Sequence, residues 1–195
     1  MRTAEISRET GETKIRVRLD LDGSGKSVID SGVGFLDHML TAFAKHARFD
    51  LEVSCKGDTC VDDHHSVEDI GIALGQAFEK ALGDKKGITR FGDTILPMDE
   101  ALVMSAVDIS GRAHLSYAVE GLNWKVGSFD TELVKEFFLG FVRNARMTLH
   151  ISKLAGENTH HILEACFKST ARSLRKAVSK DAAFADDVPS TKGTL

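Results

Sequence analysis

Two stretches of the chain, DHMLTAFAKHARFDLEV at residues 37–53 and KEFFLGFVRNARMTLHI at residues 135–151, align without a gap. In each, apolar residues recur at helical spacing up to an Ala-Arg pair and alternate with polar residues after it. This pattern predicts a short amphipathic helix followed by a strand, twice in one chain. Such internal similarity indicates a duplicated fold.

The duplication continues on both sides of these stretches. Downstream, DDHHSVEDIGIALGQAFEKAL at residues 62–82 and ENTHHILEACFKSTARSLRKAV at residues 157–178 each predict a long helix, with a loop two residues shorter before the second. Upstream, VRLDLDGSG at residues 17–25 and SAVDISGRA at residues 105–113 have the pattern of a strand followed by a turn. Each half is therefore expected to run as strands, helix, strand, helix.

This organisation predicts an α+β fold of two pseudo-symmetric halves, with mixed sheets packed against helices. We place the first half at residues 1–86 and the second at residues 87–185. The polar end of the chain, residues 186–195, is expected to be a flexible tail that contributes to an active site.

Composition excludes several classes of protein. The 25 Lys and Arg against 29 Asp and Glu leave a net charge of −4, which argues against nucleic-acid binding through bulk positive charge. No apolar run approaches the roughly 18–20 residues of a membrane span, and the N-terminus lacks the apolar region of a signal peptide. Three scattered cysteines do not make a disulfide framework. We expect a cytoplasmic protein with no nucleic-acid or membrane partner.

The most specific feature is a duplicated His-His-x-x-Glu pattern at residues 64–68 and 160–164. Helix positions three and four apart share a face, whereas neighbours diverge by about 100°. Glu68 can therefore share an ion with only one of His64 and His65, and which one stays open. A single pair of this kind is more often a solvated or capping feature. Two copies at matched positions favour metal binding, with each helix contributing to two different ions.

The repeat supplies two further candidates, because His38 in the first half aligns with Glu136 in the second. The full set of candidate metal ligands is His38, His64, His65, Glu68, Glu136, His160, His161 and Glu164. Two ions would receive about four protein ligands each and keep open positions for water or substrate. Nitrogen and carboxylate ligands without thiolate suit Mn²⁺ or Fe²⁺.

Other residues have the chemistry of substrate binding. Lys168 lies four residues after Glu164 and so shares its helix face. The tail segment STKG, residues 190–193, offers the hydroxyl, ammonium and flexible glycine that suit a closing anion clamp. Singly, each is more often a surface charge. Glu12 is either an exposed charge or a general base, and His114 and His150 are expected to have no ligand role.

Several motifs together resemble the imidazoleglycerol-phosphate dehydratase family over residues 8–192: GFLDHML, DDHHSVEDIGIALGQA, DISGR, FDTELVKEFF and THHILEACFKSTARSLR. The resemblance implies two ββαβα-like halves related to ribosomal protein S5 domain 2. It also implies a 24-subunit shell with active sites shared between subunits, and two Mn²⁺ ions in each site. By position it implies metal ligation at His38, His64, His65, Glu68, His160, His161 and Glu164. It implies substrate contact at Glu12, His46, Arg90, Arg112, Lys168, Ser190 and Lys192.

The activity implied is dehydration of D-erythro-imidazole-glycerol phosphate to imidazole-acetol phosphate in histidine biosynthesis. The proton to be removed is not next to a carbonyl group. If the two ring nitrogens each bind a metal ion, the imidazolate can expel the hydroxyl of the adjacent carbon, and a base then removes the proton from the next carbon. Glu12 is the first candidate for this base and Glu164 the second.

Three other classes of function compete with this reading. A binuclear phosphate-ester hydrolase would use the same ligand types but release inorganic phosphate. A structural assembly in which metal only fixes subunit contacts would not need the STKG tail. RNA binding, raised by the S5-like fold, fits poorly with the acidic charge.

Overall fold

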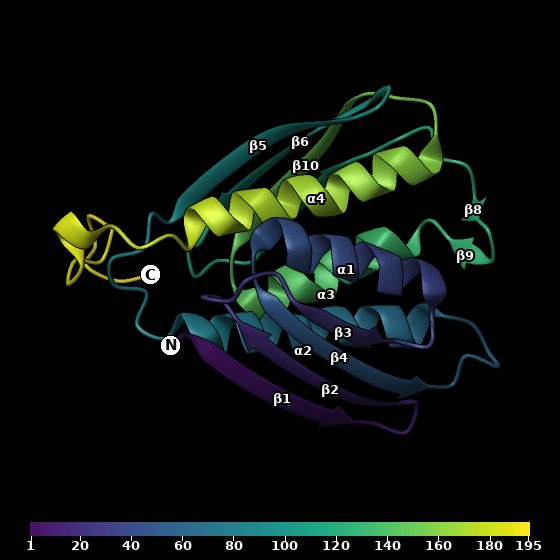
Figure 1. The fold of residues 1–195 in the computed structure, drawn as a ribbon, viewed down its shortest axis with the longest axis horizontal. Helices are drawn as coiled ribbons and strands as arrows, with labels where there is room; N and C mark the ends of the chain where they lie inside the picture. The colour runs from purple at the N-terminus through teal and green to yellow at the C-terminus, as the bar shows by residue number, and fades with distance from the viewer.

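The computed structural model describes residues 1–195 and places four long helices between two four-stranded sheets (Figure 1). The first half forms β1 (Thr3–Glu9), β2 (Thr13–Asp20), β3 (Ser27–Asp30), α1 (Gly34–Ala47), β4 (Asp50–Gly57) and α2 (His64–Leu82). The second half forms β5 (Phe91–Met98), β6 (Ala101–Asp108), β7 (His114–Ala118), β8 (Lys125–Val126), β9 (Phe129–Asp130), α3 (Leu133–Ala145), β10 (Thr148–Ala155) and α4 (Thr159–Ala177). A short 3₁₀ turn, η1 (Ala182–Phe184), follows.

The two sheets have the same topology. Their strand orders are β1-β2-β4-β3 and β5-β6-β10-β7, and the last strand of each is parallel to its neighbour. The predicted α+β class with two pseudo-symmetric halves is therefore confirmed. Strands β3 and β7 are both short and none of their residues is fully buried, so the apolar pattern in the sequence marks them only weakly.

The Ala-Arg pairs of the repeat mark the ends of two helices. Arg48 and Arg146 follow the last residues of α1 and α3 with φ of 62° and 51°, the left-handed conformation that commonly terminates a helix. The chain then turns directly into β4 or β10. The matched arginines thus reflect the same helix-to-strand turn in both halves.

One hydrophobic core spans both halves. Ile15, Val17 and Leu19 point inward from β2, as their alternation predicts. The ring of Phe141 in the second half lies 6.3 Å from that of Phe43 and 5.7 Å from that of Phe78, both in the first half. The halves consequently form a single packed unit rather than two independent domains.

Helices α2 and α3 approach each other closely because glycine lines their contact. A Cβ atom on Gly71 would lie 2.4 Å from the carbonyl oxygen of Phe137, and one on Gly75 would lie 2.4 Å from that of Phe141. No other residue type permits this backbone separation. The approach brings the start of α3, which carries Glu136, beside the start of α2, which carries His64.

The three cysteines are free, with Cys55 and Cys166 buried and Cys60 exposed. None of the helices is long and apolar enough to cross a membrane.

Candidate metal and substrate site

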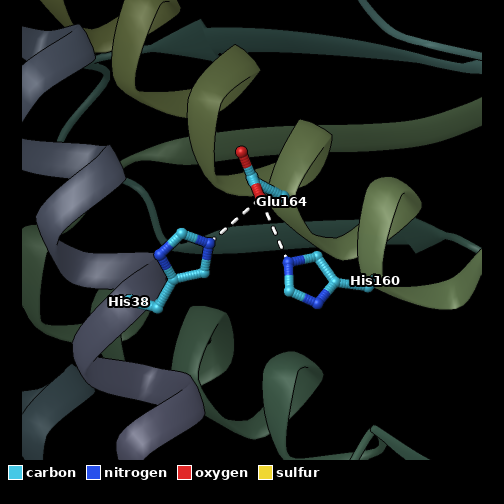
Figure 2. A group of neighbouring side chains, drawn as sticks. All are labelled: His38, His160 and Glu164. Atoms are coloured by element: carbon cyan, nitrogen blue, oxygen red, sulfur yellow. Dashed lines mark hydrogen bonds and ion pairs between the residues drawn. The ribbon is translucent and has the colours of Figure 1, made fainter.

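Helices α1 and α4 bring three of the candidate ligands together (Figure 2). Glu164 Oε2 lies 3.1 Å from His38 Nε2 and 3.2 Å from His160 Nε2, and the donor atoms of the three residues lie within 4.8 Å of one another. His160 and Glu164 are one helical turn apart on α4, while His38 reaches across from α1.

Glu164 supplies this group with a fixed negative charge. Burial raises the pKa of its carboxyl group, but hydrogen bonds from Lys168 and His38 outweigh that effect and bring the pKa to about 2. Lys168 pairs with the second oxygen, Oε1, from one turn further along α4. The carboxylate is therefore ionised at neutral pH and held from both sides.

The chemistry of this group fits a divalent cation such as Mn²⁺. It offers two imidazole nitrogens and one carboxylate oxygen without thiolate. The carboxylate is buried, whereas the His38 side chain is 51% exposed, so the group opens to solvent on one side. An ion held here would keep coordination positions free for other ligands.

The corresponding group in the first half lies on α2. His64 Nε2 is 3.9 Å from Glu68 Oε2, at the same helical spacing as His160 and Glu164. Glu136, which aligns with His38, lies on α3 beside α2, but its side chain makes no hydrogen bond or ion pair. The structure thus brings His64 and Glu68 together and does not bring the carboxylate of Glu136 to them.

The adjacent histidines diverge in both pairs, as helix geometry predicts. The rings of His64 and His65 are inclined at 75°, and those of His160 and His161 at 82°. The first histidine of each pair faces its glutamate, whereas the second turns toward a different set of carboxylates. Each helix start therefore presents two separate coordination directions.

His65 faces carboxylates from two loops. Its Nε2 lies 3.7 Å from Glu12 Oε1, in the turn between β1 and β2, and its Nδ1 lies 3.0 Å from Asp58 Oδ2. The hydrogen bond to Asp58 raises the pKa of His65. Glu12, a predicted base, is thus next to a predicted metal ligand.

His161 has a similar environment in the second half. Its Nε2 lies 3.8 Å from Asp99 Oδ2 and its Nδ1 lies 2.8 Å from Glu100 Oε2, both in the turn between β5 and β6. The hydrogen bond to Glu100 raises the pKa of His161, and the same bond holds the pKa of Glu100 at about 2. Asp58, Asp99 and Glu100 were not predicted. Aligning the β5–β6 turn with the β1–β2 turn that carries Glu12 would have pointed to the last two.

His46 lies in the last turn of α1, on the side that faces α4. Burial lowers its pKa, and the positive charges of Lys168 and Arg172 lower it further. His46 therefore lies near the α4 side chains that follow Glu164, and its substrate-contacting role stays a prediction.

The other predicted anion-binding residues gather around Asp108, at the end of β6. Arg90 pairs with Asp108 at 2.7 Å and donates to the carbonyl oxygen of Pro189 at 2.8 Å, next to Ser190 in the tail. Arg112 lies 4.0 Å from the same aspartate. The backbone amide of Lys192 donates to Ser190 Oγ at 3.2 Å. Arg90, Arg112 and the tail thus make one basic cluster.

This basic cluster lies far from the metal-ligand group of the same chain. The amide of Arg90 donates to the carbonyl oxygen of Ala177, the last residue of α4, whereas His160 is near the first. At 1.5 Å of rise per residue, the intervening helix is about 25 Å long. Figure 1 shows the tail beyond the far end of α4. A single chain consequently does not bring the two groups of predicted residues together.

His114 and His150 lie apart from these groups, on β7 and β10. Both are exposed, and their rings are 5.7 Å apart. Neither side chain forms a hydrogen bond or ion pair with a carboxylate, so the absence of a ligand role for these two histidines stays a prediction.

Comparison with known proteins places the chain among close relatives. The family model described as imidazoleglycerol-phosphate dehydratase matches residues 31–174. Proteins of that name from Granulibacter bethesdensis and Synechococcus sp. are 58% and 57% identical over all of this chain, covering 99% and 96% of their own lengths. Crystal structures of that enzyme from Staphylococcus aureus and Pyrococcus furiosus both superpose with a TM-score of 0.84. Their identities are 43% and 40%, over 92% and 97% of this chain and 99% and 100% of theirs.

Proposed function

The chain belongs to the imidazoleglycerol-phosphate dehydratase family of histidine-biosynthesis enzymes, and we propose that it converts D-erythro-imidazole-glycerol phosphate to imidazole-acetol phosphate with two Mn²⁺ ions per active site. The observation that carries the proposal is the divergence of the two histidine pairs. Each pair offers imidazole nitrogens in two directions, each next to a carboxylate. Two ions would suit a substrate whose imidazole ring has two nitrogens, because each nitrogen could bind one ion.

The residues that would hold the ions divide by direction. His38, His160 and Glu164 already form one partial site, and His64 with Glu68 forms its counterpart. His65 and His161 face away from Glu68 and Glu164, so each would ligate a different ion from the first histidine of its own pair. Glu136, alone among the candidate ligands, makes no hydrogen bond or ion pair. Mn²⁺ bound by these groups would act as a Lewis acid on the ring nitrogens and would orient the substrate between the two ions.

Glu12 is the better placed of the two candidate bases. Its carboxylate is largely exposed and lies 3.7 Å from His65 Nε2, so it borders the site and is free to reach substrate. Glu164, by contrast, is buried and holds both oxygens in bonds to His38, His160 and Lys168. A carboxylate occupied in this way serves as a ligand rather than as a proton acceptor.

The hairpin that carries Glu12 is tied to the metal-binding helix. Thr13 Oγ1 donates to Asp69 Oδ2 at 2.5 Å, and Arg8 pairs with the same oxygen at 2.5 Å. Asp69 follows Glu68 directly on α2 and is buried. The turn is therefore fixed relative to His65, which gives Glu12 a defined position despite its exposure.

The phosphate group of the substrate would be held by more than one chain. His46 and Lys168 lie beside the metal ligands of their own subunit. Arg90, Arg112, Ser190 and Lys192 lie at the far end of α4, so another copy would have to supply them. Assembly into a 24-subunit shell with shared active sites meets this requirement.

Incubation of the purified protein with Mn²⁺ and imidazole glycerol phosphate tests the proposal. We expect the ketone imidazole-acetol phosphate to form, chelation to abolish its formation, and two Mn²⁺ ions to be bound per active site. Release of inorganic phosphate without the ketone would instead identify a phosphate-ester hydrolase. Neither product, with assembly that depends on metal, would identify a structural metal protein.

A further inference from the structure

We infer that Asp58 and Glu100 are positioning residues, which hold His65 and His161 with the Nε2 atom of each ring free to ligate a metal ion. The inference rests on the proposed function for the identity of the metal. It concerns two carboxylates outside the predicted ligand set, each bonded to the far side of a predicted ligand.

The rings of His65 and His161 are each hydrogen-bonded to a carboxylate at Nδ1 but not at Nε2. His65 Nδ1 lies 3.0 Å and 3.2 Å from the two oxygens of Asp58, and His161 Nδ1 lies 2.8 Å from Glu100 Oε2. On the opposite side, the nearest carboxylates are at 3.7 Å and 3.8 Å from Nε2, beyond hydrogen-bond distance. The hydrogen bond therefore falls on Nδ1 in both rings.

This arrangement selects the tautomer that can bind metal. A neutral imidazole carries one N–H, and a carboxylate can only accept. Asp58 and Glu100 consequently place the proton on Nδ1 and leave the lone pair of Nε2 exposed. Metal-ligating histidines commonly have such a partner, and loss of it weakens metal affinity by about 10- to 100-fold.

Glu100 is itself held rigidly. Its other oxygen, Oε1, accepts the backbone amide of Asn158 at 2.8 Å and that of Glu157 at 3.3 Å. Asn158 in turn caps α4 by accepting the amides of His160 and His161. One carboxylate thus joins the β5–β6 turn, the start of α4 and the ring of His161.

The two positioning carboxylates do not come from equivalent places in the repeat. Asp58 lies in the loop before α2, whereas the loop before α4 supplies no carboxylate to His161. Glu100 comes from the β5–β6 turn, and its counterpart turn in the first half places Glu12 on the Nε2 side of His65. The same bond is therefore made from two different loops, which simple duplication of the sequence would not produce.

The variant Glu100→Gln tests the inference. The oxygen of the new side-chain amide can still accept a hydrogen bond from the backbone amide of Asn158. Its NH₂ group, however, would face His161 Nδ1 and can only donate, so that nitrogen must accept the hydrogen bond. The proton then moves to Nε2, which can no longer ligate. Glu157→Gln is the matched control, because Glu157 is exposed in the loop that contacts Glu100, and its side chain forms no hydrogen bond or ion pair with His161.

Two readouts are needed, and both are independent of turnover. Solid-state ¹⁵N NMR of the metal-free, histidine-labelled protein should show one ring change from the Nδ1–H to the Nε2–H form in Glu100→Gln. Titration with Mn²⁺, followed by electron paramagnetic resonance, should show affinity at one site fall by about 10- to 100-fold. Glu100→Asp should restore part of it, and Glu157→Gln should match the parent.

The inference is overturned if the tautomer of His161 is the same in Glu100→Gln and the parent, or if Mn²⁺ affinity does not change. Should that variant fail to fold, Asp58→Asn applies the same test to His65 with the same two outcomes. Because the tautomer is read without metal or substrate, a protein that lacks dehydratase activity would still support or refute the positioning role.

Discussion

Replacing Glu164 with glutamine removes the charge around which the α1–α4 site is organised. Glu164 accepts hydrogen bonds from His38 and His160 on one oxygen and pairs with Lys168 on the other. Glutamine has nearly the same shape but no negative charge. The variant therefore separates the electrostatic contribution of the carboxylate from its packing.

The size of the effect follows from the pKa of the carboxyl group. A pKa of about 2 in the folded protein, against an ordinary value of 4.5, corresponds to about 3 kcal/mol in favour of the ionised folded state. Because the folded pKa is the lower one, this stabilisation is present above pH 4.5 and is lost as the pH falls toward about 2. Glu164→Gln should thus lower the free energy of unfolding at pH 7 by about 2–4 kcal/mol.

Urea denaturation of the metal-free protein at pH 7 and pH 3 measures this difference. The parent should lose more stability on acidification than Glu164→Gln does, because the variant has no carboxyl group to protonate at this position. The exposed Glu157 provides a control, and Glu157→Gln should follow the parent at both pH values. A Glu164→Gln variant as stable as the parent at pH 7, with the same acid sensitivity, would refute the reasoning.

Three further predictions concern the base, the helix contact and the tail. Glu12→Gln should abolish turnover while leaving the Mn²⁺ content unchanged, and normal turnover would remove Glu12 from the role of base. Gly71→Ala would place a Cβ atom 2.4 Å from the carbonyl oxygen of Phe137 and should destabilise the protein by about 1–3 kcal/mol in thermal unfolding. Gly34→Ala, with no atom within 4 Å of its Cβ, is the control, and equal melting temperatures for both variants would contradict the packing argument. Lys192→Ala should raise KM by about tenfold or more at constant Mn²⁺ content, as loss of a charge-assisted phosphate contact predicts, and an unchanged KM would exclude it from the anion clamp.

Periodic and repeated features could be predicted from the sequence. The helices and the central strands follow from regular spacing of apolar residues, and the duplicated Ala-Arg pairs correspond to left-handed residues that end α1 and α3. The divergence of His64 from His65 follows from helix geometry alone. These features depend on residues close together in the sequence, so local patterns are sufficient to find them.

Features that depend on loops and on distant segments could not be predicted in the same way. Glu100 approaches His161 because the β5–β6 turn folds back onto the start of α4, and local spacing in the sequence does not predict that contact; only the alignment of this turn with the β1–β2 turn points to it. Similarly, Arg90 and Lys168 both have the chemistry of anion binding, but the sequence does not reveal that α4 holds them apart. The distance between these residues within one chain is therefore visible only in three dimensions.

Subunit mixing tests the shared active site most directly. Glu164→Gln removes a proposed metal ligand in the first half of α4, and Lys192→Ala removes part of the proposed anion clamp beyond the end of that helix. At substrate concentrations well below KM, each variant alone should therefore have little activity. If each site takes these residues from different subunits, co-assembly of equal amounts of the two variants should restore up to about a quarter of the parental activity. If both residues came from one chain, every site in the mixture would carry a defect. Activity no greater than that of the separate variants, in a verified mixed assembly, would contradict the account.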